Sequence, residues 1–403
     1  MVDVSGIDVI IAGGGPVGAT LALLARARGI RTTLIAADAD TRQDTGPTPA
    51  VCRPIALSHA SAHMLRGLGA LRAHDATPIE SIHVSQQAHF GRTLMQARDQ
   101  GVPALGYVID AGVLGERLRS SCPPPLSARG EVTAWQAEED GVAVEWTDGA
   151  GAACGSRARL LVIADGGERA VATDPAGIMP APNSGAPERP RTRRDYGQQA
   201  IVCSVHASLP HRGVAYERFT AAGPLALLPY EDRYAVVWSL PTARARELLR
   251  SDDAAFIRTL QDTFGMRQGR LSAPGTRLAY PLVLRRSEEI RPRVVSIGNA
   301  AQTLHPVAGQ GLNLGLRDAM ALVDQLVAQR DSIGSDRFVK HYYRRRLADR
   351  AATIAITDTL ARVFAVEVPF APLLRGAALT ALDAFSPARN FFARRMILGA
   401  RGL

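Results

Sequence analysis

Several features that would assign a chain to a membrane, disulfide or metal class are absent from this sequence of 403 residues. No uninterrupted apolar run reaches the roughly 18 residues that a spanning helix needs, so a transmembrane protein is not expected. The four cysteines, Cys52, Cys122, Cys154 and Cys203, are widely spaced and form no CxxC pair. This spacing predicts reduced thiols, with neither a disulfide framework nor a metal site. No cleavable apolar leader opens the chain, which predicts a cytoplasmic protein.

Lysine is almost absent as well. Lys340 is the only one, so arginine carries nearly all of the net charge of +9. An arginine excess favours anionic partners, among them lipid headgroups and the phosphates of NADPH. The basic residues are dispersed and no nucleic-acid-binding motif accompanies them, which argues against nucleic acid as a partner.

The first chemical signal is a glycine turn between a predicted strand and a predicted helix. Residues 7–12 are typical of a buried strand, 19–28 of a helix and 32–36 of a second strand, which together make a βαβ unit. In the pattern G-x-G-x-x-G the first glycine permits a tight turn, the second lets a pyrophosphate approach the backbone, and the third lets helix and strand pack closely. The free N–H groups and positive dipole end of the helix then favour an anion. The residues that fit this pattern and predict dinucleotide binding are Gly13, Gly15, Pro16, Val17 and Gly18.

One expected part of this motif is missing. An acidic residue at the end of the second strand normally holds the ribose hydroxyls. Here residues 34–37 are Leu-Ile-Ala-Ala, and the nearest acids are Asp38 and Asp40. Asp38 is the candidate ribose ligand, and an ordinary surface loop is the other interpretation of both acids.

A second glycine cluster joins a strand predicted over 294–297 to a helix predicted over 313–329. It reads Gly298-Asn299-Ala300-Ala301-Gln302-Thr303-Leu304-His305-Pro306-Val307-Ala308-Gly309-Gln310-Gly311-Leu312-Asn313. Backbone N–H groups at this helix start converge near Leu312 and Asn313. Such a helix start can stabilise negative charge on a bound ring or phosphate.

This segment resembles the second FAD signature of class A flavoprotein monooxygenases. More narrowly, it is similar to the ubiquinone-biosynthesis hydroxylases, and its Gly-Asn-Ala-Ala-Gln form to the 2-polyprenyl-6-methoxyphenol hydroxylase branch. Residues 53–58, Arg-Pro-Ile-Ala-Leu-Ser, resemble a family element near the flavin, and residues 195–200, 217–220 and 223–229 resemble its substrate-domain strands.

The resemblance implies the cofactor and the reaction. NADPH or NADH would reduce FAD, O2 would add to it, and the hydroperoxide so formed would hydroxylate the ring of a polyprenyl phenol. The residues that it places at the cofactor are Arg53, Asp165, Gly298, Asn299, Pro306, Gly309, Gly311, Leu312 and Asn313. Pro306 would lie beside the flavin ring, and His305 is a candidate proton donor, with a structural histidine as the alternative. The motif at Asp165 departs from the family, since Arg169 and Ala172 stand where serine and arginine are expected, which puts the coupling to NAD(P)H in doubt.

The resemblance also implies an α/β fold, in which a mixed β-sheet substrate domain interrupts a Rossmann-like FAD-binding domain and helices follow at the C-terminus. Residues 1–180 and 283–330 would form the FAD-binding domain, 181–282 the β-rich substrate domain and 331–403 a helical region. Residues 75–100 would contribute to the substrate sheet. Among the aromatic residues there, Tyr216 and Phe219 would line the cavity or fill the core, and Trp238 would fill the core.

Two questions stay open at this stage, the role of the C-terminal residues and the function. Residues 361–403 mix apolar side chains with arginine, which suits a membrane surface next to a polyprenyl substrate at the inner face of the cytoplasmic membrane. A contact in a homo-oligomer or ubiquinone-biosynthesis complex, or a helix that covers the core, explains the same pattern. For the function, the alternatives are another phenolic or quinone substrate and a flavin-binding accessory protein without turnover.

Overall fold

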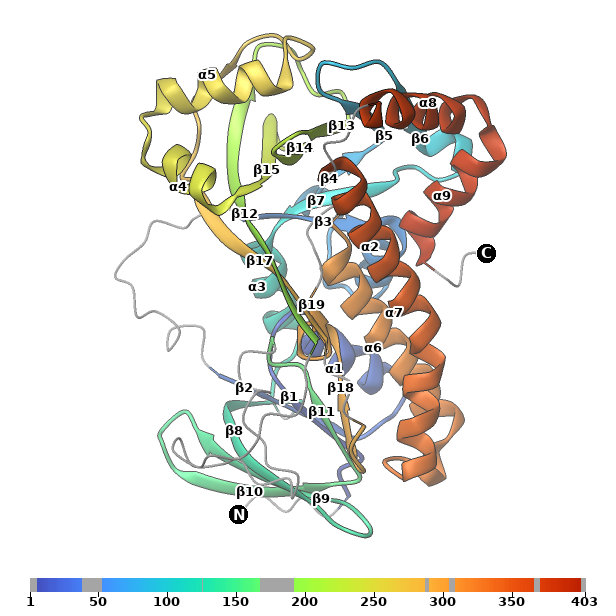
Figure 1. Ribbon diagram of the computed structural model, residues 1–403. Coiled ribbons are helices and arrows are strands. Elements are labelled where there is room, and N and C mark those ends of the chain that lie inside the picture. The colour runs from blue at the N-terminus through green and yellow to red at the C-terminus, as the bar shows by residue number, and fades with distance from the viewer. Residues whose placement is uncertain are drawn as a thin grey trace.

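Two large sheets and a set of long helices make up the molecule (Figure 1). The computed structural model describes residues 6–37, 53–124, 126–166, 192–286, 290–303, 309–365 and 370–399, excluding the side chains of 192, 193 and 360–365. All structural statements below concern these residues. Three predicted site residues, Asp38, His305 and Pro306, lie outside them.

The first sheet has seven strands in the order β10-β9-β8-β2-β1-β11-β18. Its members are β1 (Val9–Ala12), β2 (Thr32–Ala36), β8 (Ser127–Ala137), β9 (Val142–Asp148), β10 (Ala153–Ala158), β11 (Leu160–Ile163) and β18 (Val294–Ser296). From β8 to β18 the pairing is parallel, and β9 and β10 extend the edge antiparallel. The predicted βαβ unit is confirmed, because helix α1 (Pro16–Ala27) connects the parallel strands β1 and β2. Strand β1 is fully buried, as its run of apolar residues predicts for the middle of a parallel sheet.

The second sheet has nine strands, most of them antiparallel, in the order β19-β17-β12-β15-β14-β13-β5-β6, with β16 paired to β12. Its members are β5 (Ser81–Gln86), β6 (Arg92–Gln96), β12 (Thr192–Ala207), β13 (Val214–Thr220), β14 (Gly223–Tyr230), β15 (Arg233–Pro241), β16 (Leu271–Ser272), β17 (Leu278–Arg286) and β19 (Gln302–Thr303). Helices α4 (Thr242–Arg250) and α5 (Asp253–Phe264) cover one face of this sheet, where Phe256 and Trp238 meet edge to face. The sequence pattern predicted a β-rich domain over residues 181–282, and these two helices were not predicted. Trp238 is in the core, as predicted.

The remaining helices fill the space between and beside the sheets (Figure 1). They are α2 (His59–Gly67), α3 (Ala111–Ser121), α6 (Gln310–Ala328), α7 (Asp336–Ala365), α8 (Ala371–Ala384) and α9 (Ser386–Leu398), and a small sheet of β3 (Pro54–Ser58), β7 (Gly106–Asp110) and β4 (Thr77–Ile79) lies beside them. Helix α6 packs on α1, while α8 packs on β6 at the opposite end of the molecule. The predicted C-terminal helices are therefore confirmed. Among the described helices, none is both long and apolar enough to cross a bilayer.

Candidate active site

A cavity of about 1640 Å³ runs from the carboxyl ends of the seven-stranded sheet to one face of the nine-stranded sheet. Ligand pockets usually have volumes of about 300–1,000 Å³, so this cavity has room for more than one molecule. Its first part is lined by the residues that follow β1, β2, β11 and β18. In parallel sheets ligands bind outside these carboxyl ends, at the point where the strand order reverses.

The glycines at the start of α1 divide into packing positions and an open position. Gly13 has φ +115°, and a Cβ there would lie 2.6 Å from the carbonyl carbon of Ala164. A Cβ on Gly18 would overlap the carbonyl oxygen of Gly13. Gly15, the N-cap of α1, differs because a Cβ there would meet no protein atom within 4 Å. The first turn of α1 therefore faces open cavity at Gly15, and the backbone N–H groups of Gly15 and Val17 are free of helical partners there. Pro16 has no N–H to donate.

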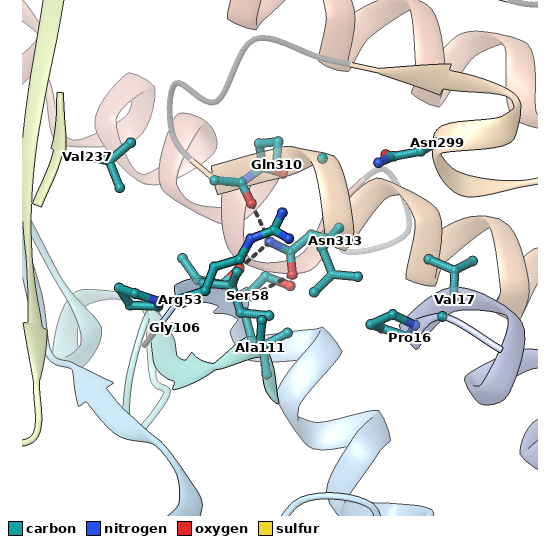
Figure 2. Close-up of a pocket in the computed structure, with 18 of the residues that line it drawn as sticks. Pro16, Val17, Arg53, Ser58, Gly106, Ala111, Val237, Asn299, Gln310 and Asn313 are labelled. Carbon is teal, nitrogen blue, oxygen red and sulfur yellow. Dashed lines mark hydrogen bonds between the residues drawn. The ribbon is translucent and has the colours of Figure 1, made fainter. Parts of the chain in front are cut away.

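The second glycine cluster brings another helix start to the same cavity. Gly309, the N-cap of α6, has a left-handed φ of +60° and sits against Ala56, whereas Gly311 faces open space. A Cβ on Gly315 would come within 2.7 Å of Val17 Cγ2. Gly315 thus allows α6 to pack tightly on α1, so that both helices begin at one cavity (Figure 2).

Asn313 has a bonding pattern that the sequence did not predict. Its side-chain oxygen accepts a hydrogen bond from Ser58 N at 2.8 Å, and its Nδ2 donates to Ala56 O at 3.0 Å and to Gly309 O at 2.7 Å (Figure 2). The amide therefore ties β3 to the start of α6. Asn313 is almost fully buried, and it lines the cavity together with Leu312.

The other predicted residues occupy distinct parts of the wall. Asn299 is exposed to the cavity beside Pro16 and Val17, and Asp165 lines the wall after β11. Gly298 has φ +61° and packs on Val17. The Arg53 guanidinium lies 4.8 Å from the centre of the Tyr280 ring, at the junction with the nine-stranded sheet. The structure thus gathers every predicted cofactor residue that it describes around one cavity, with Gly18 and Gly298 in packing roles.

A buried ion cluster that the sequence reasoning missed supports the second glycine loop. Asp318 is fully buried, and its carboxylate accepts bonds from Arg346 Nε at 2.7 Å and from Arg350 NH2 at 2.9 Å. Burial lowers the pKa of Arg350, but the Asp318 carboxylate together with Tyr342 and Tyr343 raises it, and the net shift is upward. The same carboxylate accepts from Gly298 N at 3.3 Å and Gln302 Nε2 at 3.4 Å, so it helps to position the loop. The sequence signal that could have indicated this cluster is an acidic residue in a largely apolar predicted helix, followed by a segment rich in arginine.

These observations fit FAD. A flavin dinucleotide is long enough to need both helix starts, and the two open glycines leave space where its phosphates and ring would approach the backbone. Gly15 and Val17 would hold the pyrophosphate through their backbone N–H groups, Asn299 and Asp165 would reach the linking hydroxyls, and Gly311 and Leu312 would face the ring. Ala36 and Ala37 line the wall where a ribose carboxylate is usual.

Comparisons with known proteins agree with this site. Residues 6–357 match the FAD binding domain family. The chain is 32% identical over 401 residues to ubiquinone hydroxylase UbiL of Rhodospirillum rubrum, covering 96% of this chain and 88% of that protein. It is 30% identical to 3-demethoxyubiquinol 3-hydroxylase of Escherichia coli, covering 93% and 94% of the two chains.

Solved structures share the fold. The crystal structure of p-nitrophenol 4-monooxygenase PnpA from Pseudomonas putida superposes with a TM-score of 0.69 at 17% identity, over 97% of each chain. A point variant of Klebsiella pneumoniae HpxO complexed with FAD gives the same TM-score of 0.69 at 15% identity, over 96% of this chain and 99% of that one. The fold and the family match define an FAD-dependent monooxygenase. Within that class the chain belongs to the ubiquinone-biosynthesis hydroxylase family, whose members hydroxylate aromatic rings.

Proposed function

We propose that this enzyme hydroxylates the aromatic ring of a polyprenyl phenol in ubiquinone biosynthesis, using NADPH or NADH and O2. The observation that carries the proposal is the second part of the cavity, which continues from the FAD site over an apolar sheet face. Ala200, Val202, Ala226, Leu228 and Val237 line that face. A polyprenyl phenol presents a small ring and a long apolar tail, which such a surface can bury. The names of the two curated relatives support the same substrate class.

FAD, when bound, takes a hydride from NAD(P)H and activates O2 for transfer of one oxygen atom to the ring. The protein positions the reactants, stabilises charge and excludes water from the site. The start of α6 directs backbone N–H groups at the ring site, where they can stabilise negative charge. Arg53, held over Tyr280, adds a cation at the junction of the two parts of the cavity. The apolar sheet face excludes water from the reacting ring.

Turnover with a short-chain prenylphenol tests the proposal. Purified holoenzyme with NAD(P)H and O2 should form a product heavier by one oxygen atom, with oxidation of NAD(P)H stimulated by the phenol. Product from a simple phenol or quinone alone would favour the alternative substrate class. A yellow protein with no phenol-stimulated oxidation of NAD(P)H by any compound would favour the accessory role instead.

We further propose that α8 and α9 contact a lipid surface from which the substrate enters. Their inner sides line the cavity through Leu379, Phe392 and Ile397. Their outer sides expose large apolar residues, including Leu374 at 68% and Phe385 at 61% exposure. The remaining exposed apolar side chains of this surface are Phe370, Leu373 and Phe391, and exposed Arg394 adds positive charge nearby. Apolar side chains with basic neighbours are typical of membrane-surface helices.

Co-sedimentation with anionic phosphatidylglycerol vesicles should detect this contact. We expect the double substitution Leu374→Asp with Phe385→Asp to lower the bound fraction at least tenfold, because each large apolar side chain contributes about 1.5–3 kcal/mol on burial. Met266→Asp is the matched control, since Met266 is 61% exposed on the connection between α5 and β16. Equal vesicle binding by all variants would contradict the proposal. Loss of a dimer from the double variant in size-exclusion chromatography would favour the oligomer contact.

A further inference from the structure

A row of side chains crosses the nine-stranded sheet where it faces the cavity. Ladder partners in register run from Val84 on β5 through Glu217 on β13, Ala226 on β14 and Val237 on β15 to Val202 on β12. All five line the cavity. Four are apolar, and Glu217 is the single ionisable member of the row.

The positions along β13 show the same contrast. Ala215 and Phe219, two residues to either side of Glu217, share its face and also line the cavity. Phe219 packs against Leu379 of α8, so the wall around the carboxyl group is apolar in that direction too. Neighbouring strands lie roughly 4.8 Å apart, which puts Glu217 about 10 Å from Val237. Figure 2 shows Val237 across the cavity from Gln310 at the start of α6.

The described residues offer the Glu217 carboxylate neither a hydrogen bond nor an ion pair. Burial alone raises the pKa of this carboxyl to about 7, with no contribution from a charged neighbour. A general base near neutral pH needs such a value, because it must be ionised yet basic enough to accept a proton. Among the described residues that line the cavity, Asp165 is the only other carboxylic acid, and it lies at the FAD end.

Several ionisable groups on the elements around Glu217 make contacts elsewhere. On β13 itself, Arg218 Nε donates to Thr263 O at 3.0 Å on the far face of the sheet. On β5 the buried His83 ring lies tilted against Tyr216, and neither ring nitrogen has a hydrogen-bond partner among the described residues. On α8, Asp383 accepts from Leu94 N at 2.8 Å, and on α7, Asp358 accepts from Tyr196 OH at 3.1 Å. At the junction with the FAD site, the Arg53 guanidinium lies over the Tyr280 ring, and Arg285 lines the cavity from β17. Strand β14 places apolar Ala226 directly opposite.

We propose that Glu217 is the catalytic base that accepts the proton of the substrate's phenolic hydroxyl. This inference rests on the proposed function. In the step the phenol O–H bond breaks, an O–H bond forms on the carboxyl group, and the electron pair stays on the phenol oxygen. The net charge of the pair is unchanged, and nothing is oxidised or reduced. The phenolate ring is richer in electrons and therefore reacts faster with an electrophilic oxygen, and the carboxyl group returns its proton when product leaves.

The substitutions Glu217→Gln and Glu217→Asp test the proposal in the holoenzyme. Glutamine keeps the size and loses the base, so we expect the rate of ring hydroxylation to fall about 100-fold, the lower end of typical general-base contributions. For the wild type, kcat should rise with pH to a plateau above about 7, because the carboxylate is the active form. E217Q should lose this limb of the profile, and E217D should keep it. Glu145→Gln is the matched control, since Glu145 is exposed on β9 and away from the cavity.

FAD content and the stability of the apoprotein provide readouts independent of turnover. FAD content should be the same in all variants. Since the folded-state pKa of Glu217 is raised from 4.5 to about 7, wild type should lose unfolding free energy relative to E217Q as pH rises across that interval. Wild type that hydroxylates no phenol overturns the proposed function and this inference with it. Wild type and E217Q with equal rates and equal pH profiles overturn the role of Glu217 alone.

Discussion

Replacing Asp318 with asparagine is expected to lower the free energy of unfolding by about 3–5 kcal/mol, because it removes the countercharge of buried Arg350 and leaves Arg346 with Asp349 alone. Arg346 and Arg350 both bond to this carboxylate, which has no exposed surface. Gly298 N would keep an oxygen acceptor, but one that is neutral and weaker. We therefore expect FAD affinity to fall along with stability. Denaturant titration of the apoprotein measures the first effect, and FAD titration of the still-folded fraction measures the second.

Asp324→Asn on the same helix is the control for this substitution. Asp324 pairs with Arg345 at 4.0 Å, and both side chains are more than a third exposed. Exposed ion pairs contribute about 0–1 kcal/mol, so this variant should stay within that range of the wild type. Equal losses of stability in the two variants would mean that the Asp318 cluster has no special structural role.

Gly15→Asp is expected to lower FAD affinity at least 100-fold and to leave the apoprotein as stable as the wild type. Gly15 is the N-cap of α1 in an extended conformation (φ −67°, ψ 174°), and a Cβ there meets no protein atom within 4 Å. Aspartate is a preferred N-cap residue, so the helix itself gains from the change. The new carboxylate, however, occupies the place where the pyrophosphate would bind and repels it. A variant that folds well and binds no FAD is the expected outcome.

The contrasting position is Gly155, exposed on β10, where a Cβ also meets no atom within 4 Å. Gly155→Asp adds the same charge far from the cavity and should leave FAD affinity within about twofold of the wild type. A similar fall in both variants would point to a general effect of net charge instead of the helix start.

The parts of the fold that depend on local pattern could be predicted from the sequence. The buried strand at residues 9–12, the glycine turn and the following helix are local features, and the family resemblance added the second glycine cluster. Helices α4 and α5 were missed, because their helical character depends on an apolar stripe that becomes meaningful only against the sheet face containing Trp238.

Features that depend on contacts distant in sequence could not be predicted. The Asn313 side chain accepts a hydrogen bond from Ser58, which lies 255 positions earlier in the sequence. The motif that contains Asn313 therefore gives no sign of this structural role. Asp318 meets Arg346 and Arg350 only because α7 packs on α6. Glu217 lies in a segment that resembles the family, but its isolation on an apolar face follows from strand register. His305, Pro306 and Asp38 remain predictions, as they lie outside the described residues.

FAD titration of the apoprotein, followed by flavin fluorescence, tests the central claim that two helix starts hold one flavin. The wild type should bind one FAD per chain, Gly155→Asp should match it, and Gly15→Asp should bind at least 100-fold more weakly with unchanged thermal stability. A wild type that takes up no flavin, or a Gly15→Asp variant that binds it as tightly as the wild type, would contradict the site described above.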